Sequence, residues 1–65
     1  MVEWLRFTAP DNRAVYLRDE QMVRVRYVAE GEHDKANCAI DLLAGTQFVM
    51  EPVDAVMRII KGEPL

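Results

Sequence analysis

The sequence contains no serine and only one cysteine, Cys38, among its 65 residues. Without serine there can be no Gly-x-Ser-x-Gly nucleophile elbow, and a single cysteine excludes a disulfide within the chain. The three glycines are isolated from one another, so the sequence has no glycine-rich phosphate-binding loop. Because these common catalytic motifs are missing, we expect a non-enzymatic protein without a cofactor.

The chain also lacks a long apolar run and an excess of basic residues. No segment approaches the roughly 20 apolar residues that span a bilayer. Glu3 and Arg6 interrupt the N-terminal segment in which a signal peptide would lie. The formal net charge is −3, whereas general nucleic-acid coat proteins are usually strongly basic. We therefore expect a soluble, cytoplasmic protein with no membrane partner.

Apolar residues, in contrast, are abundant for so short a chain. They make up 51% of the sequence, which is above the usual range for a soluble domain once glycine is left out. A chain of this length forms one small core and buries only about 60% of the surface that its unfolded form exposes. The surplus apolar surface and the small core both favour self-association, so we expect a homo-oligomer, most simply a homodimer.

Strand-favouring residues and turn signals predict five strands followed by one helix, all in a single domain over residues 1–65. Short connections between the strands favour antiparallel pairing. The predicted class is α+β, with one mostly antiparallel, twisted five-stranded sheet or a small open barrel. The strands are expected over 2–8, 14–18, 22–29, 37–43 and 46–50. They are separated by a turn at 9–13, a polar break at 19–21, an exposed loop at 30–35 and a turn at 44–45.

The helix is the most clearly marked element. Pro52 is tolerated at a helix start because it needs no N–H partner there, and Gly62 can adopt the left-handed conformation that ends a helix. Four apolar residues between them fall at offsets of three, four and seven positions, and therefore share one helical face. These residues are Val53, Val56, Met57 and Ile60.

Alternation along the strands predicts which side chains face the core, although an error of one residue in register would exchange the two faces of a strand. The expected inward set is Leu5, Phe7, Val15, Leu17, Val23, Val25, Ile40, Leu42, Phe48 and Met50. The expected outward set is Trp4, Arg6, Tyr16, Arg18, Arg24, Arg26, Val28 and Leu43.

Aromatic and arginine residues of the outward set form the main candidate for an interaction face. Arginine binds phosphates and stacks on aromatic rings, exposed rings can stack bases, and the same residue types dominate protein–protein hot spots. The simplest alternative is that the arginines only pair with acidic residues of neighbouring strands. The candidate face comprises Trp4, Arg6, Tyr16, Arg18, Arg24 and Arg26; the acidic partners would be Glu3, Asp19, Glu20 and Asp41.

One further group could suggest a metal site or a thiol nucleophile: His33, Asp34, Cys38 and Asp41. Histidine, cysteine and carboxylates all bind zinc, and a Cys–His pair can act as nucleophile and base. The spacing matches no established ligand pattern, however, and a cysteine within a strand is usually a small buried hydrophobe. We therefore expect no catalytic, cofactor or metal site in one chain, while a symmetric dimer could double the number of ligands.

The segment from Ile40 to Val56, continuing through Ile59 and Ile60, resembles the C-terminal half of the FlbD-type small bacterial proteins associated with flagella and swarming. In that family a strand, a glycine turn, a second strand and a short helix follow in the same order, and the resemblance is specific over residues 40–60. Hydrophobic residues of the earlier strands fall where the family places strand residues: Phe7, Val15, Tyr16, Leu17, Met22 and Val25. The resemblance implies the same β-rich fold with a C-terminal helix.

The same strand–turn–strand–helix outline is similar to part of the LytTR DNA-binding domain. Two functions are therefore expected from the sequence. The first is a protein-interaction module, a small regulator or adaptor, that binds itself and possibly one other protein. The alternative is a regulator that binds nucleic acid through the arginine and aromatic side chains of the candidate face.

Overall fold

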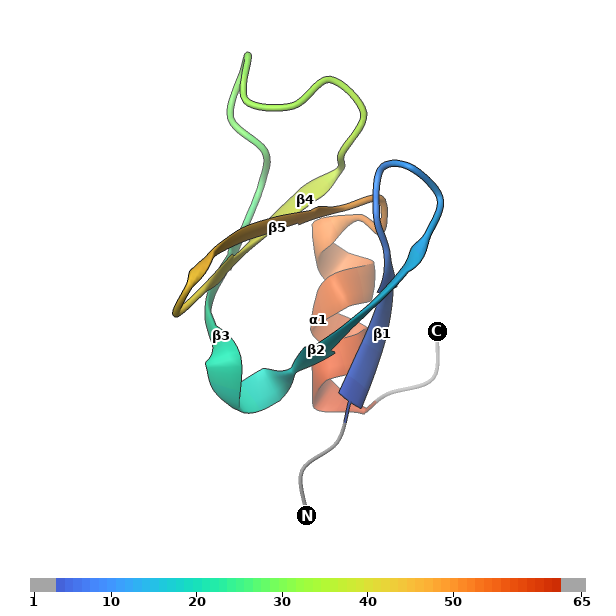
Figure 1. Ribbon diagram of the computed structural model, residues 1–65, viewed down its shortest axis with the longest axis vertical. Helices are drawn as coiled ribbons and strands as arrows, with labels where there is room; N and C mark the ends of the chain where they lie inside the picture. Colours follow the sequence, from blue (N-terminus) through green and yellow to red (C-terminus); the bar gives the residue numbers. More distant parts are fainter. Residues whose placement is uncertain (1–3, 63–65) are drawn as a thin grey trace.

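The computed structural model describes residues 4–62, and it confirms the predicted α+β class with one C-terminal helix (Figure 1). Residues 2 and 3 of the first predicted strand, including Glu3, lie outside the described residues. The elements are β1 (Trp4–Thr8), β2 (Ala14–Arg18), the short 3-10 helix η1 (Asp19–Gln21), β3 (Met22–Arg26), β4 (Cys38–Leu42), β5 (Gly45–Val49) and α1 (Val53–Lys61).

The prediction of a single five-stranded sheet is wrong. Within residues 4–62 the strands form two antiparallel sheets, one with the order β1-β2 and one with the order β3-β4-β5. The polar break at 19–21 is the cause, because it folds into the helical turn η1 and does not allow the chain to reverse as a tight hairpin. The chain thus leaves β2 in a new direction and begins a second sheet.

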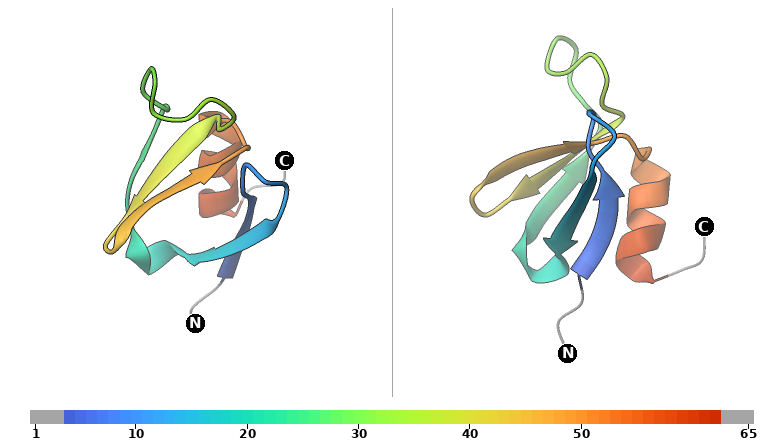
Figure 2. Two further views of the ribbon diagram at one scale, coloured as in Figure 1. Left: turned by 45° about the horizontal axis from the view of Figure 1, so that its top comes forward. Right: turned by 45° about the vertical axis from the view of Figure 1, so that its right-hand side comes forward.

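Besides the connection through η1, the two sheets are joined by hydrogen bonds at the end of β5, where the chain leads into the helix. The Met50 N–H donates to the Thr8 carbonyl at 2.8 Å, and the Thr8 N–H donates to Glu51 Oε1 at 2.9 Å. Helix α1 then contacts β1 of one sheet and β3 of the other. Figure 2 shows α1 running beside β1. The helix therefore closes the space between the two sheets.

The core lies where the sheets and the helix meet. Phe7, Cys38, Ile40, Val49 and Val56 are fully buried. Partly buried hydrophobic residues pack around them: Leu5, Leu17, Met22, Val25, Leu42, Val53, Ile59 and Ile60. Most of the predicted inward set is thus confirmed.

Two inward assignments are wrong, each because of local strand geometry. Val23 is 63% exposed, since an irregularity between Met22 and Arg24 breaks the alternation of β3. In β5 it is Val49 that is buried, while Phe48 lies opposite Ala39 on the other face. The register of the β4–β5 pair sets these faces, because Val49 lies opposite the buried Cys38 and therefore shares its side of the sheet. The hairpin turn is Leu43–Ala44, one residue earlier than expected.

The ends of the helix agree with the sequence prediction. Pro52 precedes the first helical residue in an extended conformation, and Gly62 follows the last one with φ 76°. The Gly62 N–H donates to the carbonyls of Arg58 and Ile59, which would otherwise lack partners at the helix end. The third strand, in contrast, ends at Arg26 and not at residue 29, because residues 27–37 leave the sheet as a long loop.

Candidate functional site

Four of the six predicted face residues lie together on the outer side of β1 and β2. Trp4 pairs with Arg18, and Arg6 pairs with Tyr16, across the two strands. Since successive side chains of a strand point to opposite faces, these four share the face that is turned away from Phe7. We call these four residues, Trp4, Arg6, Tyr16 and Arg18, the hairpin face.

The two rings of the hairpin face are open to solvent. Trp4 is 63% exposed and Tyr16 is 57% exposed, although large aromatic side chains are buried on average. The turn that pairs their strands is the predicted one, with Asn12 at φ 71° and the Ala9 N–H donating to the Arg13 carbonyl at 2.8 Å. The strand pairing thus holds both rings on the surface.

Arg18 fixes one side of this face. Its guanidinium carbon lies 5.6 Å from the centre of the Trp4 ring, and its Nη2 lies 2.6 Å from Glu20 Oε1. The Nε of Arg18 is buried and has no hydrogen-bond partner among the residues that the structure describes. Such a cation–π contact contributes about 0.5–1 kcal/mol at an exposed site. Trp4 is therefore held against Arg18, while Arg6 remains exposed beside Tyr16.

Arg24 and Arg26, the other two predicted face residues, lie on the second sheet and bind acidic side chains. Both donate from Nε to Asp41 Oδ2, at 2.9 and 3.1 Å respectively. Arg26 also holds Glu32 with two parallel bonds of 2.7 Å each. Paired bonds of this kind are among the strongest that a carboxylate makes. We call Arg24, Arg26, Glu32 and Asp41 the ion-pair network.

This network keeps both carboxylates ionised. The hydrogen bond from Arg26 lowers the pKa of Glu32 to about 2, and the same guanidinium is the main cause that lowers the pKa of Asp41 to about 2. The pKa of Arg26 itself is raised by Glu32 and then by Asp41. All three groups therefore stay charged near neutral pH, and the network forms an ionic contact between the long loop and the sheet.

His33 takes part in the same attachment of the loop. Its Nδ1 accepts hydrogen bonds from the N–H groups of Lys35 and Ala36, at 3.1 and 3.2 Å. The ring lies over Phe48, with 5.0 Å between the ring centres. The two neighbouring contacts, His33 with Phe48 and Glu32 with Arg26, hold the loop over the outer face of the second sheet.

The candidate metal or thiol group is not assembled. Cys38 is fully buried in the core, and burial raises the pKa of its thiol. Asp41 is bound by arginines, and Asp34 is exposed. Over residues 4–62 no three His, Cys, Asp or Glu side chains are arranged to hold a metal ion. His33 and Cys38 thus serve separate structural contacts.

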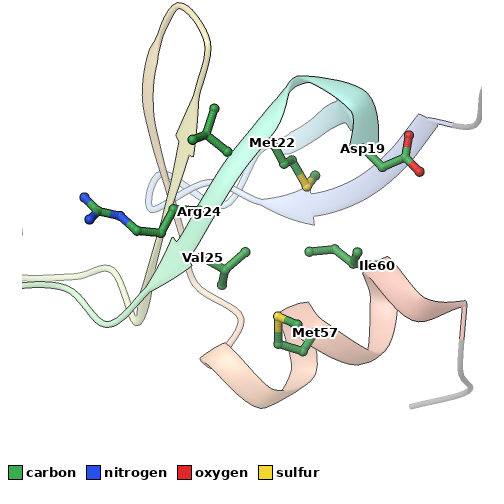
Figure 3. Close-up of a pocket in the computed structure, with 7 residues that line it drawn as sticks. Asp19, Met22, Arg24, Val25, Met57 and Ile60 are labelled. Carbon is green, nitrogen blue, oxygen red and sulfur yellow. The ribbon is translucent and has the colours of Figure 1, made fainter.

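An open pocket of about 330 Å³ lies between β3 and α1, and sequence reasoning did not predict it (Figure 3). Its apolar lining comes from both elements, with Asp19 and Arg24 at opposite ends. The wide apolar stripe of the helix is the signal that could have revealed it, because Met57 belongs to that stripe and remains 36% exposed. The lining residues are Asp19, Met22, Val23, Arg24, Val25, Met57 and Ile60.

The helix α1, the one α-helix among the described residues, is too short to cross a membrane. Comparison of the chain with protein-family models, with curated proteins and with solved structures gives no match. The interpretation of the hairpin face, the ion-pair network and the pocket therefore depends on their own geometry.

Proposed function

We propose that this chain is a non-enzymatic protein-interaction module, a small regulator or adaptor, that binds its partner through the hairpin face. The observation that carries the proposal is the pair of exposed rings, Trp4 and Tyr16, placed beside Arg6 and Arg18 on one two-stranded sheet. Tryptophan, tyrosine and arginine are the residue types that contribute most to protein–protein binding energy.

The placement of the two rings beside Arg6 favours a partner surface that is both apolar and acidic. Because Arg18 already holds Trp4 in place, binding at this ring costs little side-chain ordering. Arg6 is exposed and lies opposite Tyr16 across the two strands. A partner surface that presents an apolar patch beside an acidic side chain would complement both rings and the positive charge of Arg6.

Nucleic acid is the second candidate, and the same exposed rings beside Arg6 are the observation that favours it. The other two arginines that were expected to contact phosphate groups, Arg24 and Arg26, already bind carboxylates within the chain. Arg24 binds Asp41, and Arg26 binds both Asp41 and Glu32. The net charge of −3 and the engagement of Arg24 and Arg26 by carboxylates both disfavour contacts with phosphate groups. Protein binding is therefore the function that we propose first.

The proposal predicts which substitutions remove binding. In affinity capture from lysate of the native host, Trp4→Ala and Arg6→Glu should each reduce recovery of the main bound protein by at least about tenfold, as expected for hot-spot residues. The matched control is Tyr27→Ala, because Tyr27 is 78% exposed but lies in the long loop. Recovery by this control should equal that of the wild type.

The capture is repeated after nuclease treatment of the lysate. Unchanged recovery supports a protein partner. If Trp4→Ala and Arg6→Glu both bind as well as the wild type, the hairpin face is not the interface. If all bound material disappears with nuclease, the nucleic-acid alternative replaces the proposal.

A further inference from the structure

We propose that the pocket between β3 and α1 is the interface with a second copy of this chain, formed around a two-fold axis. The walls of the pocket are apolar side chains of both elements, and Figure 3 shows Met22 and Val25 facing Ile60 and Met57 across it. These residues lie outside the hairpin face, so self-association at the pocket does not depend on partner binding at the hairpin face.

The rim of the pocket carries apolar side chains that the monomer leaves in water. Val23 is 63% exposed, and Met57 is 36% exposed. Leu43, which is 77% exposed, lies beside the start of β3 because its N–H donates to the Gln21 carbonyl at 3.1 Å. A second copy seated on the pocket would remove Val23 and Met57 from water, and the burial of apolar surface is the main favourable contribution to such association.

The charges at the two ends of the pocket indicate that the occupant is a second copy. Asp19 is exposed at one end, and Arg24 lies at the other. The Nε of Arg24 donates to Asp41, but its side chain is 67% exposed and can also face a second copy. A two-fold axis across the pocket places the Asp19 end of one copy against the Arg24 end of the other, so that both contacts pair opposite charges. A surface that carries opposite charges at its two ends is thus complementary to itself.

The contact uses side chains and not strand pairing. The irregularity between Met22 and Arg24 bends β3 at the position of Val23, and such a bulge prevents another strand from pairing along that edge. The same irregularity turns Val23 outward, where it can enter the pocket of a second copy. One local feature of β3 therefore blocks strand addition and supplies an apolar contact.

Charge reversal tests the two-fold arrangement directly. Sedimentation equilibrium of the wild type should give twice the monomer mass at micromolar concentration. Asp19→Lys and Arg24→Glu should each weaken self-association by about a hundredfold, because each variant places like charges at both ends of its own interface. An equimolar mixture of the two variants should again sediment as a dimer. In the mixed dimer the introduced lysine of one copy faces the introduced glutamate of the other, and the unchanged Arg24 faces the unchanged Asp19, so both contacts are attractive.

The control is Arg13→Glu, which reverses an exposed charge in the β1–β2 turn and should leave the dimer unchanged. Val23→Glu should give a monomer that no mixture restores. Far-UV circular dichroism verifies that each variant is folded. A monomeric wild type, or folded Asp19→Lys and Arg24→Glu variants that do not associate when mixed, would overturn the proposal. Either result leaves binding at the hairpin face to be judged by the capture experiment.

Discussion

Phe7→Ala is expected to leave most of the protein unfolded at 25 °C. Phe7 is fully buried and belongs to the central cluster with Ile40, Val49 and Val56. Removing a buried phenylalanine side chain typically lowers the free energy of unfolding by about 3–5 kcal/mol, because transfer energy is lost and a cavity remains. A single core in a chain of this size rarely supplies more than about 3–5 kcal/mol in total. The expected loss is therefore comparable to the whole stability of the fold.

Trp4→Ala is the matched control, because it deletes a larger ring from the same strand. Trp4 is mostly exposed and contacts Arg18, so its loss should lower the free energy of unfolding by less than about 1 kcal/mol. Urea unfolding followed by far-UV circular dichroism measures both variants at one protein concentration, since self-association would add to the apparent stability. Equal losses for the two variants would contradict the described position of the core.

Acid is expected to destabilise the protein between pH 4.5 and pH 2. In the folded state the pKa of Glu32 is lowered from 4.5 to about 2 and that of Asp41 from 3.8 to about 2, chiefly by hydrogen bonds from Arg26. Below pH 4.5 the unfolded chain therefore binds more protons than the folded one, so stability falls as the pH falls. Above that range the contribution of both carboxylates is fully present.

Arg26→Met should flatten this pH dependence, because it removes the main cause of both pKa shifts. Arg13→Met is the control, since Arg13 is highly exposed and lies 3.7 Å from Asp11 outside the network. Thermal unfolding from pH 6 to pH 2 gives the slope for each protein. A slope that is the same for Arg26→Met and the wild type would show that the ion-pair network does not hold the carboxylates in the folded state.

Much of the fold was predictable because its signals are local. The strand from Ala14 to Arg18, the turn before it and the helix that Gly62 caps each depend on neighbouring residues, and each lies where the sequence predicts. The division into two sheets was not predictable in this way. It depends on whether residues 19–21 form a helical turn or a tight hairpin, and their polar composition is compatible with both.

The candidate site was predictable to a similar extent. Alternation along β1 and β2 places Trp4 and Tyr16 on one face, because the turn between these strands fixes their register. The engagement of Arg26 was harder to predict, since one of its partners, Glu32, belongs to a loop and returns to the sheet only in the folded chain. The pocket depends on the bulge at Val23, which breaks the alternation that sequence reasoning relies on.

If the hairpin face binds a protein, site-specific crosslinking in the native host should trap that protein on this face. A photoreactive phenylalanine analogue replaces Tyr16 in one strain and Tyr27 in another; both side chains are exposed, but only Tyr16 belongs to the hairpin face. We expect a defined, nuclease-resistant protein adduct from position 16 and none from position 27. Adducts at position 16 that consist of nucleic acid, or the same protein adduct from both positions, would contradict it.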